Sequence, residues 1–108
     1  MASGFGEMGS LLKQAQEMQK RLAETEAGLA SRMIEGSAGG GAVRIVVNGN
    51  QEVQSVKIEP DAVDPSDVPG LEELVKIALE QALQAAAELR KTEMGKVTGG
   101  MNLPGMGF

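Results

Sequence analysis

The chain has 108 residues, with 15 acidic and 10 basic side chains and a net charge of −5. It contains no cysteine, histidine, tryptophan or tyrosine. These absences exclude a disulfide framework, a Cys/His metal site and catalysis by a histidine-activated nucleophile. We therefore expect one small domain that is not an enzyme and that uses no cofactor, no metal and no small-molecule substrate.

The sequence also gives no sign of a membrane segment. No stretch approaches the ~20 apolar residues that a membrane helix needs. The first ten residues lack the basic and apolar regions of a signal peptide. We expect a cytoplasmic protein with no membrane partner.

The first part of the chain predicts one helix. Residues 1–9 are rich in glycine and predict a flexible lead. From Ser10, a suitable N-cap, apolar side chains recur in steps of four and three, and Gly28 is a plausible stop. We predict a helix over 10–27. The members of its seam are Leu11, Ala15, Met18, Leu22 and Thr25.

The middle of the chain predicts three strands, at 31–35, 42–47 and 53–58. The pair Asn48-Gly49 is typical of a tight hairpin turn, because both residues tolerate positive φ. Alternation in the third strand is imperfect, which indicates a bulge or a strand with two apolar faces. Val46 and Val53 fall on the second face of the sheet, so we expect both faces to be covered.

A second helix follows a connector that is rich in proline and aspartate. Pro69 suits its first turn, with Asp67 or Val68 near the cap, and Gly95 ends the pattern. Its apolar face is wide. The predicted organisation is a lead (1–9), one α+β domain (10–94) and a flexible tail (95–108). The fold class is α+β: helix, three antiparallel strands, helix.

The charge is unevenly distributed. Residues 52–80 contain eight acidic and two basic side chains, a net −6, so the remainder is about +1. A polyanion would therefore approach the first helix and the end of the second, away from the acidic connector.

Six cations are the candidate DNA contacts: Lys13, Lys20 and Arg21 on the first helix, and Arg90, Lys91 and Lys96 at the end of the second. The first three have a simpler explanation, because Lys13–Glu17, Glu17–Arg21 and Lys20–Glu24 all have the spacing of local helical ion pairs. The second three also have a simpler explanation, because cations in the last turn complement the helix dipole. The two aromatic residues, Phe5 and Phe108, lie near the ends, so stacking on bases is not expected.

Several segments in the right order resemble one family. They are Leu12-Lys13-Gln14-Ala15-Gln16-Glu17-Met18-Gln19, Gly40-Gly41-Ala42-Val43, Val47-Asn48-Gly49, Val56-Lys57-Ile58-Glu59-Pro60, Leu71-Glu72-Glu73-Leu74-Val75 with Ala78 and Ala82, and the tail from Met94 to Gly105. Together they resemble the YbaB/EbfC family of bacterial nucleoid-associated proteins over nearly the whole chain. Glu80 departs from the asparagine that is frequent in the family.

The resemblance implies a tweezer-like homodimer that joins through the sheets and projects its helices in pairs. It implies binding of double-stranded DNA with little sequence preference, altered DNA conformation, and roles in nucleoid organisation and gene regulation. The alternative is a structural or interaction module that binds a protein partner through its projecting helices. The acidic balance of the chain favours this alternative.

Overall fold

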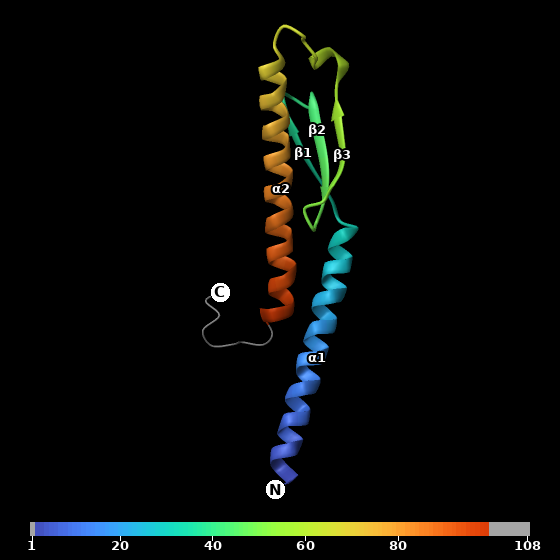
Figure 1. Ribbon diagram of the computed structural model, residues 1–108, viewed down its shortest axis with the longest axis vertical. Coiled ribbons are helices and arrows are strands. Elements are labelled where there is room, and N and C mark those ends of the chain that lie inside the picture. Colours follow the sequence, from blue (N-terminus) through green and yellow to red (C-terminus); the bar gives the residue numbers. More distant parts are fainter. Residues whose placement is uncertain (1, 100–108) are drawn as a thin grey trace.

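The structure is a computed structural model that describes the backbone of residues 2–99 and the side chains of residues 7–99. Two long helices flank a small sheet in the order α1 (Ala2–Ala30), β1 (Met33–Ala38), β2 (Val43–Asn48), β3 (Val53–Ile58), η1 (Pro60–Ala62) and α2 (Val68–Thr98). This confirms the predicted helix, three strands and helix of an α+β fold. The molecule is elongated, with a longest dimension of 79 Å (Figure 1).

The three strands form an antiparallel sheet in the order β1-β2-β3, with β2 in the centre. The predicted irregularity is present: the register between β2 and β3 shifts at Val46/Val47, so that Ser55 pairs with Val46 while Val53 pairs with Val47. The shift corrects the expected position of Val53. The extra residue brings Val53 to the same face as the core residue Val47, away from the face of Val46.

Helix α2 covers one face of this sheet. Its alanines Ala78, Ala82 and Ala86 are fully buried against Val43, Ile45 and Val47 of β2. Small side chains at four-residue spacing bring the helix backbone close to the strands. At Gly36 of β1 the approach is so close that an added Cβ would collide with the backbone at Ala78 and Ala82.

The prediction that both faces are covered is wrong for the single chain. On the face turned away from α2, Arg44 and Lys57 are exposed cross-strand partners, and Val46 is half-buried. Two helices were available, but only α2 lies along the sheet. Helix α1 extends away from it toward the N-terminus (Figure 1).

Helix α1 is longer than predicted at both ends. It begins at Ala2, within the segment that we expected to be a lead, and passes through Gly28 to Ala30. The helix continues beyond Gly28, and this last turn places Leu29, which is only 2% exposed, against the β2–β3 connection. Of the predicted seam, Met18, Leu22 and Thr25 are half-buried, whereas Leu11 and Ala15 are exposed.

The β2–β3 connection differs from the predicted two-residue turn. It spans residues 49–52, and the positive φ occurs at Gln51, at 64°. Gly49 is needed for a different reason, since an added Cβ would lie 2.8 Å from the carbonyl oxygen of Leu29. Asn48 is buried, and its side-chain oxygen accepts hydrogen bonds from the backbone N–H groups of Asn50 and Glu52.

Helix α2 starts as predicted and ends later. The Asp67 side chain accepts a hydrogen bond from the backbone N–H of Gly70, which confirms it as the N-cap. The helix passes through Gly95 and ends at Thr98, so the prediction that Gly95 ends it is wrong. An α-helix tolerates a single glycine at a modest cost. Residues 100–108 of the predicted tail lie outside the described part of the chain.

Candidate nucleic-acid interface

The three predicted cations of α1 project from its exposed surface. Lys13, Lys20 and Arg21 are all exposed, on the part of the helix that extends away from the sheet (Figure 1). None of the local ion pairs that their spacing allows is formed, since the salt bridges among side chains 7–99 are Arg90–Glu26 and Lys96–Glu93. These three cations are therefore available to an external anion.

Two of the three predicted cations of α2, Lys91 and Lys96, are open to an external anion. Lys91 is exposed and makes no ion pair with any side chain that the structure describes. Lys96 lies 3.1 Å from a carboxylate oxygen of Glu93, one turn earlier, with the Lys96 side chain 68% exposed and that of Glu93 26%. Such a pair contributes little to stability and can be exchanged for a phosphate.

Arg90 is engaged within the protein. Its guanidinium donates a hydrogen bond of 2.7 Å to Oδ1 of Asn50 and lies 3.7 Å from the carboxylate of Glu26. Arg90 thus contacts both α1 and the β2–β3 connection. Of the six candidates, it is the one whose charge is already used to join elements of the fold.

The acidic connector lies at the opposite end of the molecule from these cations, while α1 itself also carries four glutamates. The connector from Glu59 to Asp67 and the first turn of α2 lie far from the N-terminus of α1 and the C-terminus of α2 (Figure 1). The carboxylate of Asp64 accepts hydrogen bonds from the hydroxyl and the backbone N–H of Ser66, which lower its pKa below the ordinary value of 3.8. At neutral pH Asp64 is charged, as any exposed aspartate is, and it helps to keep this end anionic.

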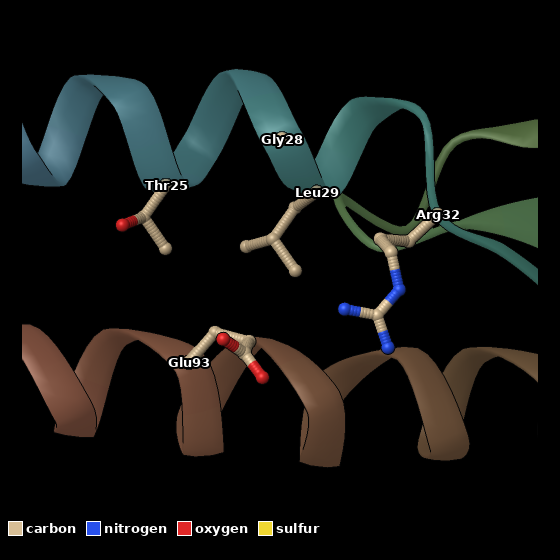
Figure 2. A pocket seen from close by; sticks show the side chains of 5 residues that line it. All are labelled: Thr25, Gly28, Leu29, Arg32 and Glu93. Atoms are coloured by element: carbon tan, nitrogen blue, oxygen red, sulfur yellow. The ribbon is translucent and has the colours of Figure 1, made fainter.

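One further cation lies on the groove between the helices, and the sequence analysis missed it. Arg32 lines a cavity of about 270 Å³ with Thr25, Gly28 and Leu29 of α1 and Glu93 of α2. Figure 2 shows its guanidinium extending from the end of α1 toward α2. Arg32 follows the end of α1 at Ala30 and directly precedes β1, so no helical pattern includes it, and its position beside α2 depends on the fold.

The remaining chemistry of the described residues is limited. Across residues 7–99, no group of three or more acidic side chains is arranged to hold a metal ion. Over the same part of the chain, neither helix has an apolar stretch long enough to cross a membrane. The features that stand out are charged helices and the groove between their ends.

The class defined by this arrangement is a small helix–sheet–helix domain with exposed cations on its long helices. The sequence model of the YbaB/EbfC DNA-binding family matches residues 5–101. The match covers most of the chain, so the chain belongs to this family, as its resemblance predicted.

Similar proteins agree with this assignment. A nucleoid-associated protein of Alkaliphilus metalliredigens is 47% identical over 103 residues, covering 95% of this chain and 90% of that protein. A nucleoid-associated protein of Clostridium kluyveri is 46% identical with the same coverage. A crystal structure of an uncharacterized protein of Helicobacter pylori superposes with a TM-score of 0.69 at 25% identity, covering 82% of this chain and 89% of that one.

Proposed function

We propose that this chain is a nucleoid-associated protein that binds double-stranded DNA in the bacterial cytoplasm. Membership of a DNA-binding family is the observation that carries the proposal. The exposed cations of the two helices, which lie away from the acidic connector, support a DNA contact on this surface. The proposed contacts are Lys13, Lys20, Arg21, Lys91 and Lys96.

The proposed contact is with the phosphate backbone. Long flexible lysine side chains on a helix surface supply point charges, which position a protein on a duplex without reading base edges. Base stacking is not part of the proposal, since the chain contains two aromatic residues, both near its ends. Binding should therefore show little sequence preference. Its consequences would be altered DNA conformation, nucleoid organisation and changed gene expression.

The proposal includes a homodimer that joins through the sheets. Strand β3 is an edge strand whose valines Val53 and Val56 are 53% and 54% exposed, on the side of the sheet that carries the core. An unpaired edge beside exposed apolar side chains is a surface on which a second copy would bury area. Two copies would bring two sets of α1 cations to one duplex.

Charge reversal on α1 tests the DNA contact. We expect Lys20→Glu/Arg21→Glu to lower affinity for a random-sequence duplex by at least about tenfold at low salt, and to reduce the slope of log K against log salt by about 2 per chain. Fluorescence anisotropy across a salt series measures both quantities. Circular dichroism would check that this double variant keeps its helices.

A matched control separates location from net charge. Lys76→Glu makes the same change of charge as Lys20→Glu but lies on the part of α2 nearer the acidic end. We expect a clearly smaller loss of affinity for Lys76→Glu. Equal losses in these single variants, or retained affinity in the double variant, would contradict the assigned surface.

The oligomeric state has its own test. We expect Val53→Lys/Val56→Lys to convert a dimer to a single chain in sedimentation equilibrium, because the lysines would bury charge in the contact. Ser55→Lys is the control, since Ser55 lies on the other face of the same strand. If the unaltered protein sediments as one chain, the dimer is wrong.

A protein-binding function is the second candidate. Met8, Leu11 and Leu12 are 68%, 65% and 61% exposed on the projecting part of α1, and apolar side chains at a helix tip can dock into a partner groove. Pull-down from lysate with and without nuclease separates the two functions. Partners that survive nuclease treatment would favour this second candidate, whereas partners that disappear would favour DNA.

A further inference from the structure

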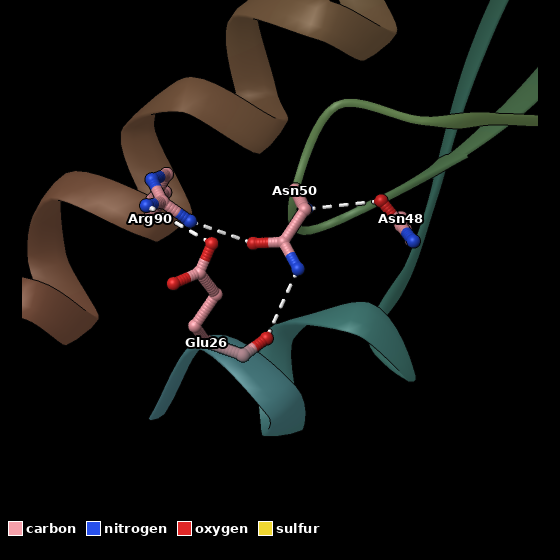
Figure 3. A network of polar contacts seen from close by, with 4 residues as sticks. All are labelled: Glu26, Asn48, Asn50 and Arg90. Carbon is pink, nitrogen blue, oxygen red and sulfur yellow. Dashed lines mark hydrogen bonds and ion pairs between the residues drawn. The ribbon is translucent and has the colours of Figure 1, made fainter. Parts of the chain in front are cut away.

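Three elements meet at a small polar junction made by Glu26, Asn50 and Arg90. Asn50, in the β2–β3 connection, donates from Nδ2 to the backbone carbonyl of Glu26 at 3.0 Å and accepts from Arg90 through Oδ1 at 2.7 Å. Figure 3 shows the Asn50 side chain between the end of α1 and α2, with the Glu26 carboxylate turned toward Arg90. One amide side chain therefore links the two helices.

The end of α1 is also fixed to the hairpin itself. The backbone N–H of Gly49 donates to the carbonyl of Leu29 at 2.9 Å, and Nδ2 of Asn48 donates to the carbonyl of Ala30 at 3.2 Å. These bonds hold the last turn of α1 against β2. They leave the direction of the rest of the helix to be set by the next contact, which is the junction of Asn50 with Arg90.

Apolar packing along α1 is partial. Among its described side chains, Leu29 at its end is the one that is buried, and Met18, Leu22 and Thr25 are half-buried. The Glu26 and Arg90 side chains are 58% and 36% exposed, so their ion pair is screened by water. The hydrogen bonds of Asn50 are therefore the directional part of the junction.

Small changes of angle at the junction become large displacements at the cations. Lys13 precedes Glu26 by thirteen residues, about 20 Å along an α-helix. A change of about 15° in the direction of α1 at Glu26 would move Lys13 by about 5 Å. That displacement is larger than the distance across an ion pair, so it would break a phosphate contact.

We propose that Asn50 and Arg90 are positioning residues that fix the direction of α1 relative to α2, and so set the spacing between the DNA-binding cations of the two helices. This inference rests on the proposed function. It assigns Arg90 a different part from the other five cations: Arg90 acts through Asn50 and Glu26, and does not contact a phosphate.

The first test measures the direction of α1 without DNA. The chain has no cysteine, so Gln14→Cys and Gln84→Cys, both at exposed helix positions, can carry a pair of spin labels. Dilution with unlabelled chain leaves the distances within one chain. We expect one narrow distance distribution, and a broader or displaced one in Asn50→Ala.

A matched control comes from the same hairpin. Gln54→Ala also removes a side-chain amide, but the hydrogen bond that it loses is to Glu52 within the connection. We expect Gln54→Ala to keep the narrow distribution. Thermal unfolding of each variant would show whether its stability also changes. An unchanged distribution in Asn50→Ala overturns the proposal.

The second test uses the sign of a change in DNA affinity. Asn50→Ala frees Arg90 from its hydrogen bond without changing any charge, so a phosphate contact by Arg90 would make this variant bind DNA at least as tightly as the unaltered chain. A positioning role predicts the opposite, a loss of about threefold to tenfold, the order expected from a lost hydrogen bond. The salt slope should be unchanged, because Asn50→Ala removes no cation.

The outcomes separate this inference from the proposed function. Tighter or unchanged DNA binding by an Asn50→Ala chain whose distances have broadened overturns the positioning role and leaves the α1 cations in place. If the unaltered chain does not bind DNA, the proposed function is wrong. The distance measurement then still decides whether the junction sets the direction of α1.

Discussion

Helices α1 and α2 have nearly the same length, 29 and 31 residues, and very different surroundings. Helix α2 buries Ala78, Ala82 and Ala86 against the sheet, whereas the described side chains of α1 include one buried residue, Leu29. Helix α2 is therefore part of the core, whereas α1 is attached to the domain mainly through its own C-terminal turns. A helix attached in this way can present charges far from the domain, and its direction depends on few contacts.

The largest effect on the free energy of unfolding should come from a substitution at the contact between α2 and the sheet. Gly36→Ala should destabilise the fold by at least about 3 kcal/mol, because the added Cβ meets the backbone at Ala78 and Ala82, which has little room to move. Urea unfolding measures the change. Gly28→Ala in α1 is the matched control: its Cβ meets open space, so we expect a gain of about 0.5–1 kcal/mol. Equal effects would mean that α1 and α2 are packed alike.

The next effect should come from the point at which α1 is attached. Leu29→Ala should cost about 2–3 kcal/mol, because it removes the buried side chain that packs against Gly49. Leu22→Ala, at a half-buried position about two turns earlier, should cost clearly less. Urea unfolding of the two variants compares the sites. A larger loss at Leu22 would move the attachment toward the middle of the helix.

A smaller effect should follow from removing the cap of α2. Asp67→Ala should destabilise the protein by about 1 kcal/mol, because the backbone N–H of Gly70 loses its side-chain acceptor. Asp67→Asn keeps an acceptor oxygen and should recover most of this stability. Thermal unfolding followed by circular dichroism measures both variants, and equal losses would indicate that the charge of Asp67 matters and its hydrogen bond does not.

The smallest effect on the free energy of unfolding should come from a substitution in the projecting part of α1. Leu12→Lys should change the free energy of unfolding by no more than about 0.5 kcal/mol, since Leu12 is 61% exposed and its burial contributes little in the single chain. A loss of more than about 1 kcal/mol would show that α1 is covered in solution, as it would be by a second copy or a bound partner.

The sequence predicted the elements of the core well and the ends of the helices poorly. The third strand matches at 53–58, and of the two predicted cap residues, Asp67 and Val68, the structure selects Asp67. The first strand, predicted at 31–35, lies at Met33–Ala38. Gly28 and Gly95 were expected to end helices and do not. Glycine has a low helix propensity, but its cost in free energy is small. The continuation of α1 beyond Gly28 buries Leu29 against a segment that is distant in the sequence, and no local pattern reveals this contact.

The candidate site was predicted in part. Helical spacing and charge counting located the cations of α1 and the acidic connector, and the structure places them at opposite ends of the molecule (Figure 1). They did not reveal that Arg90 joins Glu26 and Asn50, because those residues are distant in the sequence. Arg32 was missed for the same reason, since it lies near Glu93, which is distant from it in the sequence.

The amino-acid sequence by itself determined the order of helix, strands and helix, the apolar face of α2 and the separation of charge along the chain, because each depends on residues close in sequence. Only the tertiary structure decided that α2 alone covers the sheet, that the register shift moves Val53 to the core side, and that Asn50 links α1 to α2. These depend on which distant segments come into contact. Hydrogen bonds and close packing between such segments are settled by the fold as a whole.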